Sequence, residues 1–206
     1  GLGDVYKRQD GTRSGNGTAW LEDGSIYSGN WVDDYPDGKG TYLFPDGTEY
    51  EGGFSRGKKH GQGTFKEADG FVSYDGEWKD GQRFGKGRVN KRDSSSYDGD
   101  WLDGKPHGNG MFTYPDGRVY TGTMKQGLRQ GLGELRRSDG SIAYEGEWDR
   151  NLRHGKGKAY SASGLIKFDG DFFEGYQSGT GSEYRDDGTL YYLSLIHISE
   201  PTRLAI

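Results

Sequence analysis

The sequence of 206 residues contains 39 Gly and 15 Tyr, while its hydrophobic residues amount to only 30%. So few aliphatic side chains exclude a thick core between two layers, and an aromatic content of 14% excludes a disordered chain. The absence of cysteine excludes disulfides and thiolate metal sites. The formal net charge of -5 argues against nucleic acid as a partner.

The two ends of the chain do not follow the pattern between them. Residues 4–9 read DVYKRQ, and residues 193–203 read LSLIHISEPTR. Both resemble translations of one short DNA adapter used in sequencing libraries, read from its two complementary strands. We therefore expect residues 1–9 and 193–206 to be non-native and set them aside. Residues 10–192 are then expected to be an internal fragment of a longer protein.

Residues 10–192 are organised as a repeat array, because a partial unit at 10–26 is followed by seven units spaced by 23 or 24 residues. The first residues of these units are Tyr27, Tyr50, Tyr74, Tyr97, Tyr120, Tyr144 and Phe168. Glycine follows two positions later, and a large apolar residue such as Trp78 two positions after that. A pair of glycines then closes the unit, for example Gly85 and Gly87. A fixed period of this length indicates stacked supersecondary units.

Each unit is predicted to be one β-hairpin. Alternate residues share one face of a strand, so Tyr74, Gly76 and Trp78 lie together, whereas the polar residues between them face the other way. The Gly-x-Gly segment forms the second strand, where glycine is expected to make room for rings of neighbouring repeats.

The hairpin register predicts charge pairs between the two strands of a unit. It is fixed by placing Trp78 opposite Gly85. The expected pairs are Glu77–Lys86 and Asp75–Arg88 in the third unit, and Glu147–Lys156 and Glu145–Lys158 in the sixth.

Three features suggest chemistry but have a simpler interpretation. Residues 52–59, GGFSRGKK, approach a phosphate-binding loop, yet the same glycine spacing recurs in other units and indicates a hairpin turn. His60, His107 and His154 recur in alternate units, about 19 Å apart, too far to share a metal ion. We expect them to be turn residues that stack on or bond to a neighbouring loop. The acidic strand face shows no calcium-loop spacing and is read as solvated.

The pattern Y-x-G-x-W followed by H-G-x-G resembles the MORN (membrane occupation and recognition nexus) repeat, most clearly at residues 97–117, YDGDWLDGKPHGNGMFTYPDG. The resemblance covers residues 10–192 and departs locally at Asp34, Ser94 and Met124. Pattern and resemblance together predict an all-β, elongated, single-layer solenoid of consecutive antiparallel hairpins.

Two sets of residues are candidates for partner binding. A single-layered ribbon is expected to leave part of its aromatic face uncovered, which marks a docking surface. This candidate face consists of Tyr27, Trp31, Tyr50, Phe54, Tyr74, Trp78, Tyr97, Trp101, Tyr120, Tyr144, Trp148, Phe168 and Phe172. A candidate basic rim consists of Arg56, Lys58, Lys59, Arg83, Lys86, Arg88, Arg150, Arg153, Lys156 and Lys158.

We therefore expect a non-catalytic scaffold or targeting module with no cofactor and no metal. Its partner is expected to be a protein or a second copy of the chain. One alternative, implied by the resemblance, is the regulatory or targeting region of a larger enzyme such as a phosphatidylinositol-phosphate kinase. Another is a peripheral binder of anionic phospholipid through weak contacts of the basic rim. No apolar run is long enough to span a membrane. A cytoplasmic location is expected, with association with the cytoskeleton or a membrane as an alternative.

Overall fold

The computed structural model describes residues 11–185, 187 and 189–195, and every regular element in them is a β-strand. The strands are β1 (Gly15–Trp20), β2 (Ile26–Val32), β3 (Tyr35–Leu43), β4 (Glu49–Ser55), β5 (Lys58–Lys66), β6 (Val72–Lys79), β7 (Gln82–Asn90), β8 (Ser96–Leu102), β9 (Lys105–Thr113), β10 (Val119–Lys125), β11 (Leu128–Arg136), β12 (Ile142–Asp149), β13 (Leu152–Tyr160), β14 (Ile166–Phe173), β15 (Tyr176–Tyr184) and β16 (Leu190–Leu195).

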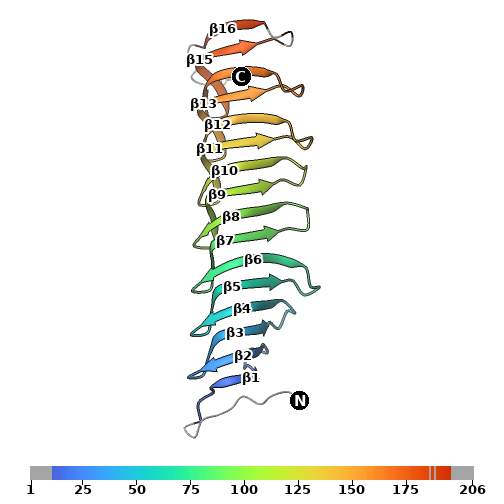
Figure 1. The fold of residues 1–206 in the computed structure, drawn as a ribbon, viewed down its shortest axis with the longest axis vertical. Helices are drawn as coiled ribbons and strands as arrows, with labels where there is room; N and C mark the ends of the chain where they lie inside the picture. Colours follow the sequence, from blue (N-terminus) through green and yellow to red (C-terminus); the bar gives the residue numbers. More distant parts are fainter. Residues whose placement is uncertain (1–10, 186, 188, 196–206) are drawn as a thin grey trace, which may run out of the picture. The chain divides into compact units, whose positions relative to one another are not determined.

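The chain divides into two compact units, residues 1–106 and 107–206. In the first, β1 to β8 pair antiparallel, each with the next along the chain (Figure 1). In the second, β9 to β16 pair in the same way. The predicted all-β architecture of consecutive antiparallel hairpins is therefore confirmed within each unit.

Each predicted repeat folds as a hairpin closed by a two-residue turn in which both residues have positive φ. In the third repeat these residues are Asp80, with φ 50°, and Gly81, with φ 85°. Two such residues form the turn whose twist matches that of the flanking strands. Gly57 occupies the second position of the turn between β4 and β5. The phosphate-loop-like segment at 52–59 is thus a hairpin, as the recurring spacing predicted.

The hairpin register agrees with the prediction only as far as the glycine pair. Asp75 lies opposite Arg88, and Glu145 opposite Lys158, as expected. The expected pairing of Trp78 with Gly85 is wrong, because the register shifts after Gly76 and Trp78 lies opposite Arg83. Gly85 takes a φ of 59° at this irregularity, a conformation that glycine adopts without a steric penalty.

The register shift also changes the partner of the acidic residue beside it. The Glu77 carboxylate accepts a hydrogen bond from the backbone N–H of Lys86 at 2.9 Å, and Glu147 does the same for Lys156. The predicted Glu77–Lys86 and Glu147–Lys156 side-chain pairs are therefore wrong. The ammonium groups point to the next strand instead, where Lys86 pairs with Asp100 at 2.5 Å.

The repeated tyrosine packs over the glycines of its own hairpin. A Cβ placed on Gly87 would collide with the ring and hydroxyl of Tyr74, and one placed on Gly76 would collide with backbone of β7. The expectation that these glycines accommodate rings of neighbouring repeats is wrong, since Tyr74 and Gly87 belong to one repeat. The Tyr74 hydroxyl donates to the carbonyl of Glu77 at 2.9 Å, which fixes the ring in place.

The large apolar residue, in contrast, connects neighbouring repeats. Trp78 donates from Nε1 to the carbonyl of Gly63 in the preceding hairpin at 3.0 Å. Trp148 makes the same bond to Gly133 in the second unit. The ring of Trp78 also meets the edges of Tyr74 and Tyr50, with centroids 5.0 and 5.3 Å away. Each hairpin therefore completes its core with residues of the preceding one.

The segments set aside from the sequence lie mostly outside the described residues. Only Gly11 onward is described at the amino end, so residues 1–9 fall outside. At the carboxyl end β16 ends at Leu195 and includes three residues of the segment 193–206. That these segments are non-native stays a prediction.

Candidate functional site

The thirteen aromatic residues of the candidate face form the core, because their exposed fractions are only 0–7%. Their rings pack edge to face, both within a repeat and between neighbouring repeats, as Tyr144 does with Trp148 and Phe172. The expectation that these rings leave an uncovered stripe is therefore wrong. The physical reason is that side chains of the second strands lie over them.

Five cations provide much of this cover. They occupy one repeat position, immediately before that of His60 and His154, and we call them the covering cations: Arg13, Lys59, Arg83, Arg129 and Arg153. In the first unit, the Arg83 guanidinium lies 5.0 Å from the ring centroid of Tyr74 and 5.2 Å from that of Trp101. In the second, Arg129 lies 4.0 Å from the centroid of Trp148. A cation over an aromatic face is attracted by the ring quadrupole.

Lys59 is the covering cation whose charged group has the most aromatic rings around it. Its ammonium nitrogen lies 4.5 to 5.2 Å from the ring centroids of Phe44, Tyr50, Phe65 and Trp78. Burial among these rings, together with the positive charge of Arg83, lowers the pKa of Lys59 to about 8. Lys59 is therefore a cation that is held away from water.

The ten residues of the candidate basic rim do not lie together. Lys59, Arg83 and Arg153 cover rings, as Arg153 does over Tyr144 and Phe172. Lys86, Arg88, Lys156 and Lys158 face the acidic residues of adjacent strands, for example Lys156 with Asp171 at 2.6 Å. Arg56, Lys58 and Arg150 lie at hairpin turns. The prediction that these ten residues form one basic rim is wrong, because successive residues of a strand project to opposite faces.

The residue at the second turn position decides whether a covering cation is bonded. Its backbone N–H donates to the carbonyl of the covering cation in the preceding repeat, as Asn151 does to Arg129 at 3.1 Å. The side chain of Asn151 then accepts from the backbone N–H of Arg129 at 2.9 Å. The guanidinium of Arg129 donates to the carbonyl of Asn151 at 2.6 Å. Asp34 holds Arg13 in the same way, with both the backbone N–H and Nε donating to Oδ1 at 3.0 Å.

Where this turn position is glycine, the side-chain acceptor is absent. Gly81 and Gly104 make the same backbone bonds to the carbonyls of Lys59 and Arg83, at 2.9 and 3.0 Å. Within the described part of the chain, the ammonium of Lys59 and the guanidinium of Arg83 then have rings as neighbours but no hydrogen-bond acceptor.

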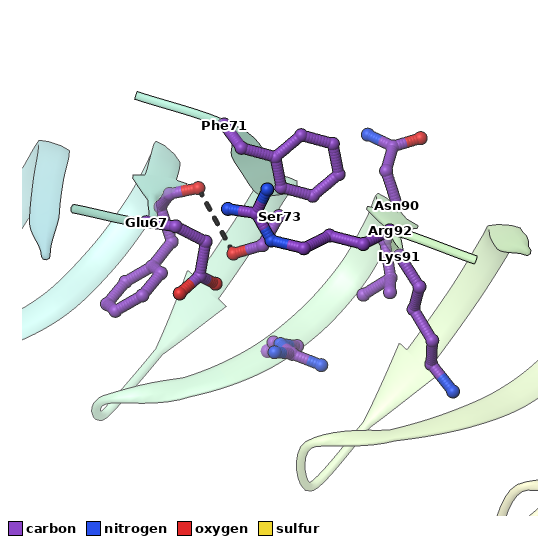
Figure 2. Close-up of a pocket in the computed structure, with 9 residues that line it drawn as sticks. Glu67, Phe71, Ser73, Asn90, Lys91 and Arg92 are labelled. Carbon is purple, nitrogen blue, oxygen red and sulfur yellow. Dashed lines mark hydrogen bonds between the residues drawn. The ribbon is translucent and has the colours of Figure 1, made fainter. Parts of the chain in front are cut away.

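A groove of about 400 Å³ in the first unit is lined in part by Arg83 (Figure 2). It is lined by Phe65, Glu67, Phe71, Ser73, Arg83, Val89, Asn90, Lys91 and Arg92. Phe65 belongs both to this groove and to the rings around Lys59. Figure 2 shows Arg92 extending beside Phe71, where its guanidinium lies 4.9 Å from the ring centroid. The groove therefore combines apolar walls with positive charge.

Comparison with known families identifies the repeat. The MORN repeat pattern matches residues 27–49, 50–71, 74–89, 97–117, 120–142, 144–166 and 168–190. The chain belongs to the MORN repeat family. MORN repeats are typically modules for protein or membrane interaction.

Other comparisons add little to this family assignment. No curated protein matches the sequence. Among solved structures, the chain is similar to the SAS-4 (dCPAP) TCP domain in complex with a proline-rich motif of Ana2 (dSTIL) of Drosophila melanogaster. That match has 10% sequence identity and a TM-score of 0.38, and it covers 92% of this chain and 87% of the other.

Several residues of the groove were not among the sequence-based candidates for the MORN array. Phe71 and Arg92 belong to the connection between β5 and β6 and to that between β7 and β8, which vary between repeats. Val89 occupies the position of Phe65 one repeat later. A comparison of this position across repeats would have found Val89, whereas nothing in the spacing indicated the two connection residues.

The histidines of the MORN repeats lie in second strands, so their placement in turns is wrong. His60, His107 and His154 belong to β5, β9 and β13. The expected stacking occurs at His154, whose ring centroid lies 5.5 Å from that of Phe173. Among the described residues no three His, Asp or Glu side chains gather as they would around a metal ion. The same residues contain no helix that could cross a membrane.

Proposed function

We propose that this MORN array is a non-catalytic scaffold that binds an extended segment of a partner protein in the groove of the first unit. The observation that carries this proposal is the groove itself, with Phe65, Phe71 and Val89 as apolar walls beside Arg83 and Lys91. Apolar pockets bordered by a few convergent polar groups are typical of binding sites.

The core of the array is closed, which directs binding to this groove rather than to the buried rings. Tyr74 has an exposed fraction of 0% and Trp78 of 7%, so a partner cannot contact most of either ring without unfolding the hairpin. Phe65 and Phe71, by contrast, are only partly covered. A partner side chain that enters between them replaces water on both rings.

Anionic phospholipid is the less favoured partner. Lysine and arginine side chains lie on both faces of the strands, and Lys86, Lys156 and Lys158 have carboxylate partners there. A membrane would meet only one face, and therefore only part of the positive charge.

Selection from a random peptide library displayed on phage tests the proposed function directly. We expect peptides selected on the purified chain to bind at least about tenfold more weakly to Phe71→Ser, because the variant removes an apolar wall. Leu165→Ser is the matched control, since Leu165 occupies the same repeat position as Phe71 in the second unit and is exposed. A library that yields no binding peptide, or peptides equally affected by both variants, would contradict the proposal.

A further inference from the structure

We propose that Lys59 and Arg83 are two anion subsites, one repeat apart, which bind carboxylates three residues apart in an acidic, extended segment of the partner. This inference rests on the proposed function and specifies the chemistry of the segment that the groove accepts. Four observations support it: the two cations lack a hydrogen-bond acceptor among the described residues, they lie one repeat apart, the charge around them is positive, and the turn residue next to each is glycine.

Both cations are partly removed from water without an anion to compensate them. The rings of Tyr50, Phe65 and Trp78 surround the Lys59 ammonium, and Tyr74 and Trp101 flank the Arg83 guanidinium. Burial lowers the pKa of both groups. Hydrogen bonds between a guanidinium or ammonium and a carboxylate are among the stronger ones in proteins. A carboxylate brought by a partner would supply the missing acceptor at each position.

The spacing of the two cations selects an extended chain. Lys59 lies in β5 and Arg83 in β7, so the two positions are separated by two strand spacings, which is about 9.6 Å. Three residues of polyproline II helix advance the chain by about 9.3 Å. A segment with an acidic residue at every third position therefore places successive carboxylates beside successive covering cations. An α-helix would bring residues three apart to only about 4.5 Å along its axis.

The charge of the groove favours an acidic segment. Its lining contains the three basic residues Arg83, Lys91 and Arg92 and the acidic residue Glu67, a balance of 3 − 1 = +2. Arg92 is already bonded to Asp69 at 2.6 Å. Glu67 forms no ion pair with Arg83 in the described part of the chain. The counter-charge for Arg83 is therefore expected from outside the repeat.

The chain itself shows what an occupied subsite looks like. The Asn151 carbonyl and Oδ1 lie 2.6 and 3.4 Å from the guanidinium of Arg129, where a partner carboxylate would lie at Arg83. Gly104 holds the equivalent turn position next to Arg83, with φ 75° against 71° for Asn151. No atom lies within 4 Å of a Cβ added to Gly104. An asparagine at position 104 would therefore fit, and its side chain would accept a hydrogen bond from Arg83 of the same chain.

The substitution Gly104→Asn gives a test that keeps the charge of Arg83. The probe is a fluorescent peptide of repeated Glu-Pro-Pro triplets, whose binding to the full chain is followed by anisotropy. We expect Gly104→Asn to weaken binding about tenfold, because the guanidinium is already hydrogen-bonded. Gly104→Ala is the matched control, since it has the same backbone constraint without the acceptor, and we expect it to bind as the unaltered chain does.

Three results would overturn the inference. One is equal binding by Gly104→Asn and Gly104→Ala. The second is equal binding of a peptide with the same composition but its glutamates consecutive. The third is loss of binding in Gly104→Asn for phosphatidylserine vesicles but not for the peptide, which would assign the subsites to lipid. If these results appear while selected library peptides still depend on Phe71, the proposed function stands and only the acidic specificity fails.

Discussion

The two units of the chain have the same kind of core, and within each unit the covering cations differ according to the turn residue that follows them. In residues 107–206, the guanidinium of Arg129 is bonded to Asn151, whereas Arg153, whose turn residue is Gly175, lies over the rings of Tyr144 and Phe172. In residues 1–106, Arg13 is bonded to Asp34, whereas Lys59 and Arg83 meet rings and Arg83 also lines the groove. A single residue in the following turn accounts for the difference between Arg129 and Arg83.

Exposed apolar residues lie at hairpin turns in both units. In the second unit Leu152, Phe173 and Tyr176 lie at hairpin turns with exposed fractions of 46, 48 and 79%. In the first unit the same positions are apolar in the first repeat, where Val32 and Tyr35 are 49 and 57% exposed, and polar in the third, where they are Lys79 and Gln82. The fold therefore accepts both apolar and polar residues at these turn positions, which leaves them available for binding specificity.

The largest expected effect tests whether the core is common to both units. Gly87→Ala and Gly157→Ala would each force a buried tyrosine ring to move, and we expect either change to lower the free energy of unfolding by about 3 kcal/mol. Chemical denaturation followed by tryptophan fluorescence measures this. Gly81→Ala is the control, because a Cβ there meets no atom within 4 Å and only its φ of 85° is unfavourable. A cost for Gly87→Ala no greater than for Gly81→Ala would show that the ring is not tightly held.

A smaller effect is expected when the turn residue is changed the other way, from asparagine to glycine. Asn151→Gly removes Oδ1, which accepts from the backbone N–H and from Nε of Arg129, and leaves only the backbone carbonyl of residue 151 as an acceptor, so we expect it to loosen the hold on Arg129. We expect the Glu-Pro-Pro peptide to gain a second, weaker site in the second unit, with affinity improved about threefold over the unaltered unit. Anisotropy titration of the double variant Gly104→Asn, Asn151→Gly isolates this site. If the double variant binds no better than Gly104→Asn alone, the turn residue does not control access to the cation.

An effect of about the same size is a pH dependence that distinguishes Lys59 from Arg83. Burial lowers the pKa of Lys59 from 10.5 to about 8, and the positive charge of Arg83 adds to this shift. The Tyr50 phenol ring also faces the Lys59 ammonium. The folded state therefore binds fewer protons than the unfolded state between these values, and the contribution of Lys59 to stability rises with pH across that window. Binding of the acidic peptide should change oppositely, weakening about threefold from pH 7 to pH 9 as Lys59 loses its charge.

Lys59→Arg provides the comparison for this titration. Arginine keeps its charge throughout that range, so the variant should bind the peptide equally at both pH values. Circular dichroism at each pH checks that the fold is retained. A pH dependence that persists unchanged in Lys59→Arg would assign the titration to another group.

The repeat, the hairpins and the shared face of Tyr74 and Trp78 could be predicted from the sequence, because they follow from its period and from strand alternation, which are local properties. The sequence also identified the glycine spacing at 52–59 as a turn. Local spacing could not reveal the register shift at Gly85, which moved Trp78 opposite Arg83 and gave Glu77 a backbone partner.

The closure of the aromatic face, and the identity of the cations that close it, could not be predicted from the sequence, because they depend on contacts between hairpins. Whether a ring is exposed depends on the side chain that a neighbouring strand places over it, and that neighbour is set by pairing between hairpins. The difference between Arg83 and Arg129 arises in the same way, since the residues that decide it, Gly104 and Asn151, lie in the next hairpin. Their effect passes through a contact between repeats, which the pattern within one repeat does not contain.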